Sequence, residues 1–162
     1  MHDIANRLIA GAAAGSVATG PMTLLMTGLH KELPRQEQYP LPPRQITMAA
    51  AEAVDLENQL SEPEKQALTL AAHFGYGAGA GALYGAVAPH IPFSPVANGI
   101  VYGLAVWTGS YLGWLPAAGI LPPATEEPAR RNALMIGAHV LWGAVLGWTT
   151  NQLLKDKGDS HE

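Results

Sequence analysis

The chain has 162 residues, a formal net charge of −4 and no cysteine. The length suits one domain, and without cysteine there can be no disulfide, iron–sulfur cluster or thiol nucleophile. The charge offers no basic patch for nucleic acid, so no nucleic-acid partner is expected.

The distribution of charge is more informative than its sum. Charged side chains make up 14% of the chain, against about a quarter in soluble domains. Residues 66–125 contain no Asp, Glu, Lys or Arg, which is too long a stretch for a water-exposed surface. The sequence therefore predicts an integral, multi-pass membrane protein surrounded by a lipid bilayer.

Four uncharged segments are long enough to cross a bilayer, which takes about 20 helical residues. In chain order they are residues 8–29, 66–88, 96–115 and 133–154. The first has 22 residues, more than the apolar core of a signal peptide, so we expect it to be retained. Pro21 should kink this helix. Ser16, Thr19, Thr23 and Thr27 form one face of it and are expected to bond back to its backbone, with a hydrophilic lining for a narrow path as the alternative.

The loop after the first segment predicts a short amphipathic helix between Arg44 and Leu60. Apolar residues recur there at heptad spacing, with acidic residues between them. Such a helix could lie on the membrane surface, against a partner, or folded over its own bundle.

Two helix starts are predicted from capping patterns. Residues 61–64 read Ser-Glu-Pro-Glu, the spacing of a capping box. Residues 125–128 read Thr-Glu-Glu-Pro, with a hydroxyl cap and acids at the positive end of the helix dipole.

The chain reads as one unit present twice. Each copy has an apolar helix with paired glycines, a Leu-Pro and then a Leu-Pro-Pro loop, and a capped helix containing Ala-His. The matching residues are Gly11 and Gly15 with Gly99 and Gly103, Pro42 and Pro43 with Pro122 and Pro123, and His73 with His139. Two crossings per unit give both copies the same orientation, about an axis along the membrane normal. We expect an all-α, four-transmembrane-helix bundle over residues 1–162, with repeats at about 8–88 and 96–154.

The two intramembrane histidines define the candidate site. His73 and His139 lie at matching positions of the second and fourth segments, about 10 Å below one membrane face. An unpartnered polar group in lipid is costly, so each needs an explanation. An aromatic residue follows each histidine at i+3 and a glycine at i+4, so the candidate site comprises His73, Tyr76, Gly77, His139, Trp142 and Gly143.

Several roles for the histidines remain open. They could be hydrogen-bonded ties across the bundle, the two axial ligands of a b-type haem, or part of a proton or ion path. A metal centre is less favoured because no Asp, Glu or Cys accompanies them. Nothing in the spacing predicts catalytic residues.

We therefore expect a non-enzymatic scaffold, accessory subunit or channel-like element, with a b-haem electron carrier as the alternative. The third segment carries more glycines than one neighbouring helix needs, at positions 99, 103, 109 and 113. Small-residue ladders of this kind favour helix association. We expect a homo-oligomer or a larger membrane complex.

Three short motifs carry a family resemblance. They are Tyr-Pro-Leu-Pro-Pro-Arg at residues 39–44, Gly-Ile-Leu-Pro-Pro at 119–123 and Gly-Ala-His-Val-Leu-Trp at 137–142. With these motifs the chain resembles the YagU-type bacterial inner-membrane proteins, in which His73 also matches a histidine. The resemblance implies a multi-pass protein of the bacterial plasma membrane and supplies no enzyme activity.

Overall fold

The structure is a computed structural model that describes residues 4–159, with side chains as far as Lys155. Every regular element in this part is helical, which confirms the all-α class. The elements are α1 (Ile4–His30), η1 (Arg35–Glu37), α2 (Pro42–Glu52), η2 (Glu57–Gln59), α3 (Glu62–Val87), η3 (Ala88–His90), α4 (Pro95–Gly109), the π-helical turn η4 (Ser110–Trp114), α5 (Leu115–Ala117), η5 (Ala124–Glu126) and α6 (Ala129–Asp159).

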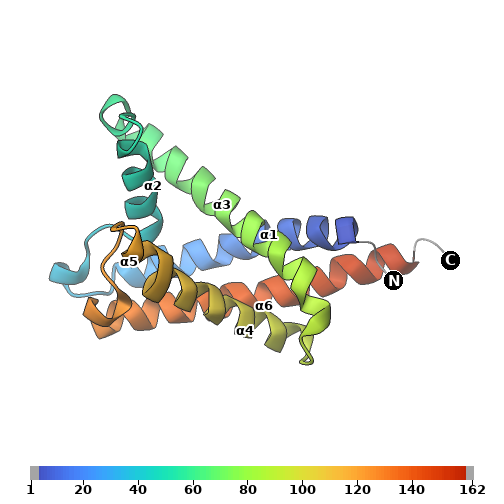
Figure 1. Ribbon diagram of the computed structural model, residues 1–162. Coiled ribbons are helices and arrows are strands. Elements are labelled where there is room, and N and C mark those ends of the chain that lie inside the picture. The colour runs from blue at the N-terminus through green and yellow to red at the C-terminus, as the bar shows by residue number, and fades with distance from the viewer. Residues whose placement is uncertain (1–3, 160–162) are drawn as a thin grey trace.

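Helices α1 and α6 form the centre of the molecule and run antiparallel, so both termini lie at one end (Figure 1). α3 packs on α1, and α4 packs on α6. α3 and α4 make few contacts with each other, and α3 runs obliquely away from the other helices towards α2 (Figure 1). The first half of α3 is therefore separated from α4 and η4.

Glycine allows the closest helix approaches. A Cβ added at Gly81 of α3 would lie 2.2 Å from the carbonyl oxygen of Gly11 in α1. A Cβ added at Gly99 of α4 would lie 1.9 Å from the carbonyl oxygen of Gly143 in α6. Both distances are far below van der Waals contact, so the two backbones touch where no side chain fits. The paired glycines noted in the sequence thus form the α1–α3 and α4–α6 crossings.

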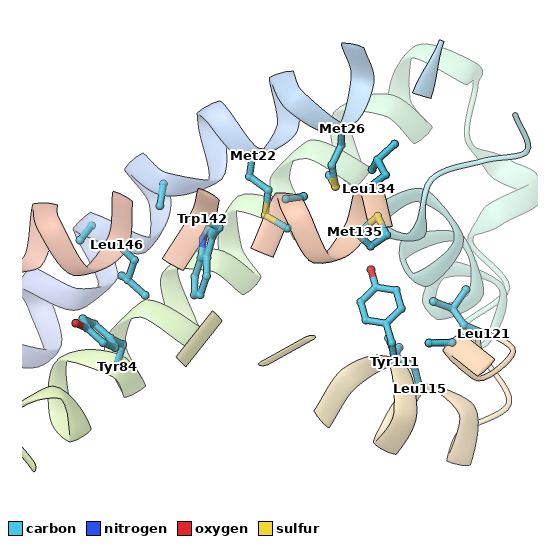
Figure 2. Packing of buried hydrophobic residues seen from close by; sticks show 14 residues of the cluster. Met22, Met26, Tyr84, Tyr111, Leu115, Leu121, Leu134, Met135, Trp142 and Leu146 are labelled. Carbon is cyan, nitrogen blue, oxygen red and sulfur yellow. The ribbon is translucent and has the colours of Figure 1, made fainter. Parts of the chain in front are cut away.

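The hydrophobic core follows α1, α6 and the end of α4 (Figure 2). Met22 and Met26 of α1 face Leu134 and Met135 of α6, and Tyr111 of η4 reaches towards them (Figure 2). Methionine fills irregular spaces because its side chain is unbranched and flexible. Most of the buried hydrophobic residues that form this core come from α1 and α6.

Two helices of the described part, α1 and α6, are long and apolar enough to cross a membrane, where the sequence predicted four. α3 has the length, but its glycines, tyrosines and histidine lower its mean hydropathy. The predicted third segment is not one continuous helix. α4 ends at Gly109, and the π-helical turn that follows contains Gly113 with φ −116° and ψ −107°, outside the helical region.

Several local predictions hold and others need correction. Thr19 and Thr23 do bond back to the helix, at 2.8 Å to Gly15 O and 2.7 Å to Thr19 O. The Ser61–Glu64 capping box is present, with Ser61 N donating to Glu64 Oε2 at 2.8 Å. The second predicted cap is wrong. Thr125 lies in η5 and α6 begins at Ala129, because Glu127 is extended, with ψ 149°.

The predicted amphipathic helix is also shorter than expected. α2 ends at Glu52 rather than near Leu60. Asp55 has φ 56°, a left-handed conformation that interrupts the helix, and only the short turn η2 follows. The heptad pattern was therefore misleading beyond the first three turns.

One buried arginine joins the two loops at the end remote from the termini. Arg131 of α6 is 4% exposed and donates to the carbonyl oxygens of Glu37 at 2.8 Å, Tyr39 at 3.1 Å and Pro40 at 3.2 Å. It also contacts the Glu127 carboxylate at 3.2 Å. These bonds fix the loop between α1 and α2 against the start of α6.

Candidate functional site

An apolar cavity of about 470 Å³ lies among α1, α2, α3, η4 and α6. Its walls include Thr19 and Met22 of α1, Ile46 of α2, and Val106 at the end of α4. Among the described residues that line it there is no Asp, Glu, Lys or Arg. Ligand cavities in proteins have volumes of about 300–1,000 Å³, so this one is large enough for a small organic molecule.

The cavity reaches the surface between α2, α3 and η4. Lining residues there are exposed, among them Val54 at 69%, Tyr76 at 50% and Trp114 at 45%. The opening is therefore lateral, between helices, and is bordered by apolar and aromatic side chains.

Five of the six predicted site residues line this cavity: His73, Tyr76, Gly77, His139 and Trp142. Gly143 does not. It faces α4, where a Cβ would lie 2.2 Å from the carbonyl oxygen of Gly99. Gly77 also serves close packing, because a Cβ there would lie 2.1 Å from Thr19 Oγ1.

The two aromatic residues of the predicted site have different surroundings. Trp142 is 3% exposed, and its indole nitrogen donates to Gly15 O and Thr19 Oγ1, both at 3.3 Å. Tyr76 is half exposed, and its hydroxyl meets Ser110 Oγ at 3.3 Å across the space between α3 and η4. Trp142 therefore joins α6 to α1, whereas Tyr76 stands at the opening.

The hydrogen bond of His139 fixes its tautomer. Its Nδ1 lies 2.8 Å from the carbonyl oxygen of Met135, which can only accept. Nδ1 therefore carries the proton, and Nε2 of the neutral ring has a free lone pair. Within the described part of the chain no hydrogen bond to that Nε2 is formed, although the residue is 7% exposed and lines the cavity.

The same reasoning applies to His73. Its Nδ1 lies 3.3 Å from Thr23 Oγ1, and that hydroxyl donates its one hydrogen to Thr19 O at 2.7 Å. The threonine oxygen must therefore accept from Nδ1–H, which leaves the Nε2 lone pair of His73 free. Both imidazoles line one cavity, each held by its own partner, and among the described side chains no hydrogen bond joins the two rings.

Sequence reasoning missed two contributors to the cavity. The first is Tyr111 of η4, 8% exposed, whose ring meets that of His139 edge-on with centroids 5.8 Å apart. The second is the face of α2 that includes Pro43, Ile46 and Ala50. The glycines at 109 and 113, on either side of Ser110–Leu112, could have indicated the irregular turn, and such π-helical turns are frequent at functional sites.

These features define a class: an all-helical protein with two helices that could cross a membrane and an apolar, histidine-containing cavity between its helices. Residues 27–148 match the family described as Protein of unknown function (DUF1440), and the chain belongs to that family. It matches no curated protein and no solved structure.

Proposed function

We propose that this chain is a multi-pass membrane protein that binds a lipid-soluble molecule in its cavity and catalyses no reaction itself. The observation that carries the proposal is the charge-free cavity of about 470 Å³ with two imidazoles in its wall. A cavity of this kind excludes water-soluble ions by their cost of desolvation and accepts apolar molecules.

The lateral opening supports the same proposal. Val54, Tyr76 and Trp114 border it with apolar or aromatic surface, which suits a molecule that enters from the bilayer. Ion channels are usually lined by carbonyl or charged groups. The apolar lining therefore supports binding over the channel-like alternative.

For the membrane arrangement we propose four crossings, with α3 and the α4–η4 segment completing the two crossings of α1 and α6. The two glycine crossings, Gly11 with Gly81 and Gly99 with Gly143, support a tandem repeat. The resemblance to YagU-type proteins supports the bacterial plasma membrane. Gly109 and Gly113 take no part in the α4–α6 crossing, and these unused small residues support a homo-oligomer.

Ligation of a b-type haem is the second candidate function. It is favoured by the free Nε2 lone pairs of His73 and His139, the atoms through which histidine commonly binds haem iron. Haem carries two propionates, and within residues 4–155 no cationic side chain lines the cavity to pair with them. The visible absorption spectrum of the purified protein separates this candidate from the first, because bis-histidine haem gives a strong Soret band.

The binding proposal can be tested with a cavity-filling pair of variants. Val106→Trp places a large ring in the cavity, whereas Val101→Trp makes the same change on the exposed side of α4, outside the cavity lining. Native mass spectrometry after gentle extraction should find a co-purified small molecule on the wild type and on Val101→Trp, and not on Val106→Trp. Equal retention by both variants, or no bound molecule on any of them, would overturn the proposal.

A further inference from the structure

The polar groups of the cavity limit what kind of head group it can hold. Two imidazoles present lone pairs from Nε2, since Nδ1 of His139 donates to Met135 O and Nδ1 of His73 donates to Thr23 Oγ1. A lone pair in an apolar wall is satisfied only by a donor. A matching ligand must therefore bring hydrogen-bond donors.

The lining also limits the charge and shape of the ligand. With no Asp, Glu, Lys or Arg in the wall, a charged head group would lose its hydration without gaining a partner. The rings of Tyr76, Tyr111, Trp114 and Trp142 line the same cavity as the two histidines. Aromatic walls pack best against a flat ring, by edge or by face.

A third polar group can act on the oxygen of such a head group. Among the described residues the hydroxyl of Tyr111 has no hydrogen-bond partner, and Figure 2 shows it pointing away from η4 towards α6. A hydroxyl both donates and accepts. The Tyr111 hydroxyl can therefore donate a hydrogen bond to the oxygen of a ligand hydroxyl that itself donates to Nε2 of His139.

We propose that the ligand is a neutral amphiphile with a phenol or hydroquinone head group on an apolar tail. One hydroxyl donates to Nε2 of His139 and, in a hydroquinone, the second donates to Nε2 of His73. The tail passes Tyr76 and Trp114 through the lateral opening into the lipid. This assignment rests on the proposed function, since it names the chemical class of the molecule that the cavity binds.

The experiment measures binding to the full chain in lipid nanodiscs with three probes that share a benzene ring and a decyl tail. They are decylhydroquinone under anaerobic conditions, 4-decylphenol, and the dimethyl ether of decylhydroquinone, which carry two, one and no donors. The hydroquinone should bind at least about tenfold more tightly than the ether, with the phenol between them, because each donor satisfies one unpaired imidazole nitrogen in the cavity wall.

Two variants of His139 test which atom accepts. His139→Asn keeps an amide near the Nδ1 position, so the bond to Met135 O can persist, but it removes the acceptor at Nε2. His139→Gln places an amide oxygen near the Nε2 position. We expect His139→Asn to reduce the preference for hydroquinone over ether to within about threefold, and His139→Gln to retain most of it. His73→Asn should remove the preference for hydroquinone over phenol.

The outcomes distinguish this inference from the proposed function. Equal affinity for the three probes, abolished for all by Val106→Trp, would overturn the head-group assignment and leave the binding function standing. A preference unchanged in both asparagine variants would also overturn it. If no probe binds, or if the purified protein shows a Soret band, both the head-group assignment and the proposed binding of a lipid-soluble molecule would be overturned.

Discussion

The guanidinium of Arg131 lies over the ring of Tyr39, with Cζ 3.6 Å from the ring centroid. Tyr39 in turn donates its hydroxyl to the Glu127 carboxylate, which also pairs with Arg131. Each of these three side chains thus contacts the other two, and together they join the loop after α1 to the start of α6. Because the guanidinium is buried and also binds three carbonyl oxygens, this cluster should stabilise the molecule more than a surface ion pair.

Replacing Arg131 by Ala should therefore lower the free energy of unfolding by about 3–5 kcal/mol, since Glu127 and the loop carbonyls lose their partner. Lys at this position should restore little of it, because an ammonium cannot reproduce the planar fork of donors. The neighbouring Arg130 is exposed, and Arg130→Ala should change stability by less than about 0.5 kcal/mol. Unfolding in detergent measures all three, and a similar loss in the two alanine variants would contradict the interpretation.

Tyr39 also predicts a pH dependence of stability. Burial and the hydrogen bond to Glu127 raise the pKa of Tyr39 from 10.0 to about 12. The folded state therefore holds this proton more tightly than the unfolded state, so the contribution is fully present below pH 10 and is lost as the pH rises towards 12. Stability of the wild type should fall more steeply over that interval than that of Tyr39→Phe. Parallel profiles would show that Tyr39 has an ordinary pKa.

The glycine crossings can be tested by one pair of variants on α3. Gly81→Ala places a methyl group against the Gly11 carbonyl and should cost about 1–3 kcal/mol or displace α3. At Gly79 an added Cβ meets nothing within 4 Å. Gly79→Ala should thus be neutral or stabilising by about 0.5–1 kcal/mol, since alanine favours helix. Thermal unfolding of the two variants should move in opposite directions, and equal shifts would mean that the crossing lies elsewhere.

The histidines should behave independently in the empty protein. Each ring has its own partner, Thr23 for His73 and Met135 for His139. The losses in stability from His73→Asn and His139→Asn should then add to within about 0.5 kcal/mol. With bound hydroquinone the two changes should become non-additive, because both rings hold one molecule. A double-mutant cycle in both states measures this, and strong coupling without ligand would indicate direct contact between the rings.

The four-crossing arrangement can be mapped with single cysteines, since the chain has none of its own. Cysteines at Gln36 and Glu126, in the two Leu-Pro-Pro loops, should react with an impermeant maleimide from one side of the membrane. A cysteine at Phe93, between α3 and α4, should react from the other side. Labelling of all three from the same side would exclude crossings by α3 and α4.

The sequence predicted correctly those features of the fold that depend on neighbouring residues, and it failed where an element ends for a reason that its apolar pattern does not contain. The capping box at Ser61 and the back-bonding threonines of α1 are local, and local chemistry predicted them correctly. The break after Gly109 lies inside a segment that has no charged residue, so the apolar pattern suggested one continuous helix. The end of α2 depends on one left-handed residue, Asp55, which a heptad pattern does not reveal.

The candidate site was also predicted only in part. The two Ala-His motifs of the sequence singled out His73 and His139, and both side chains line one cavity. The walls that α2 and η4 add could not be predicted, because they depend on where distant segments fold back. Gly143 was included from its spacing alone, and that spacing reflects a crossing with α4 rather than the cavity.

The register of the two crossings has one further consequence. A Cβ at Gly15 of α1 would meet the carbonyl of Gly77, and a Cβ at Gly103 of α4 would meet the carbonyl of His139. His139 therefore lies at the α4–α6 crossing in the position that Gly77 has at the α1–α3 crossing. His73 precedes Gly77 by four residues, so it lies about one helical turn away from the corresponding position of its own crossing. A ligand bound between His73 and His139 therefore meets a different environment at each of its ends. The cavity is thus asymmetric, and a ligand with two identical hydroxyls would still bind with those hydroxyls in chemically distinct positions.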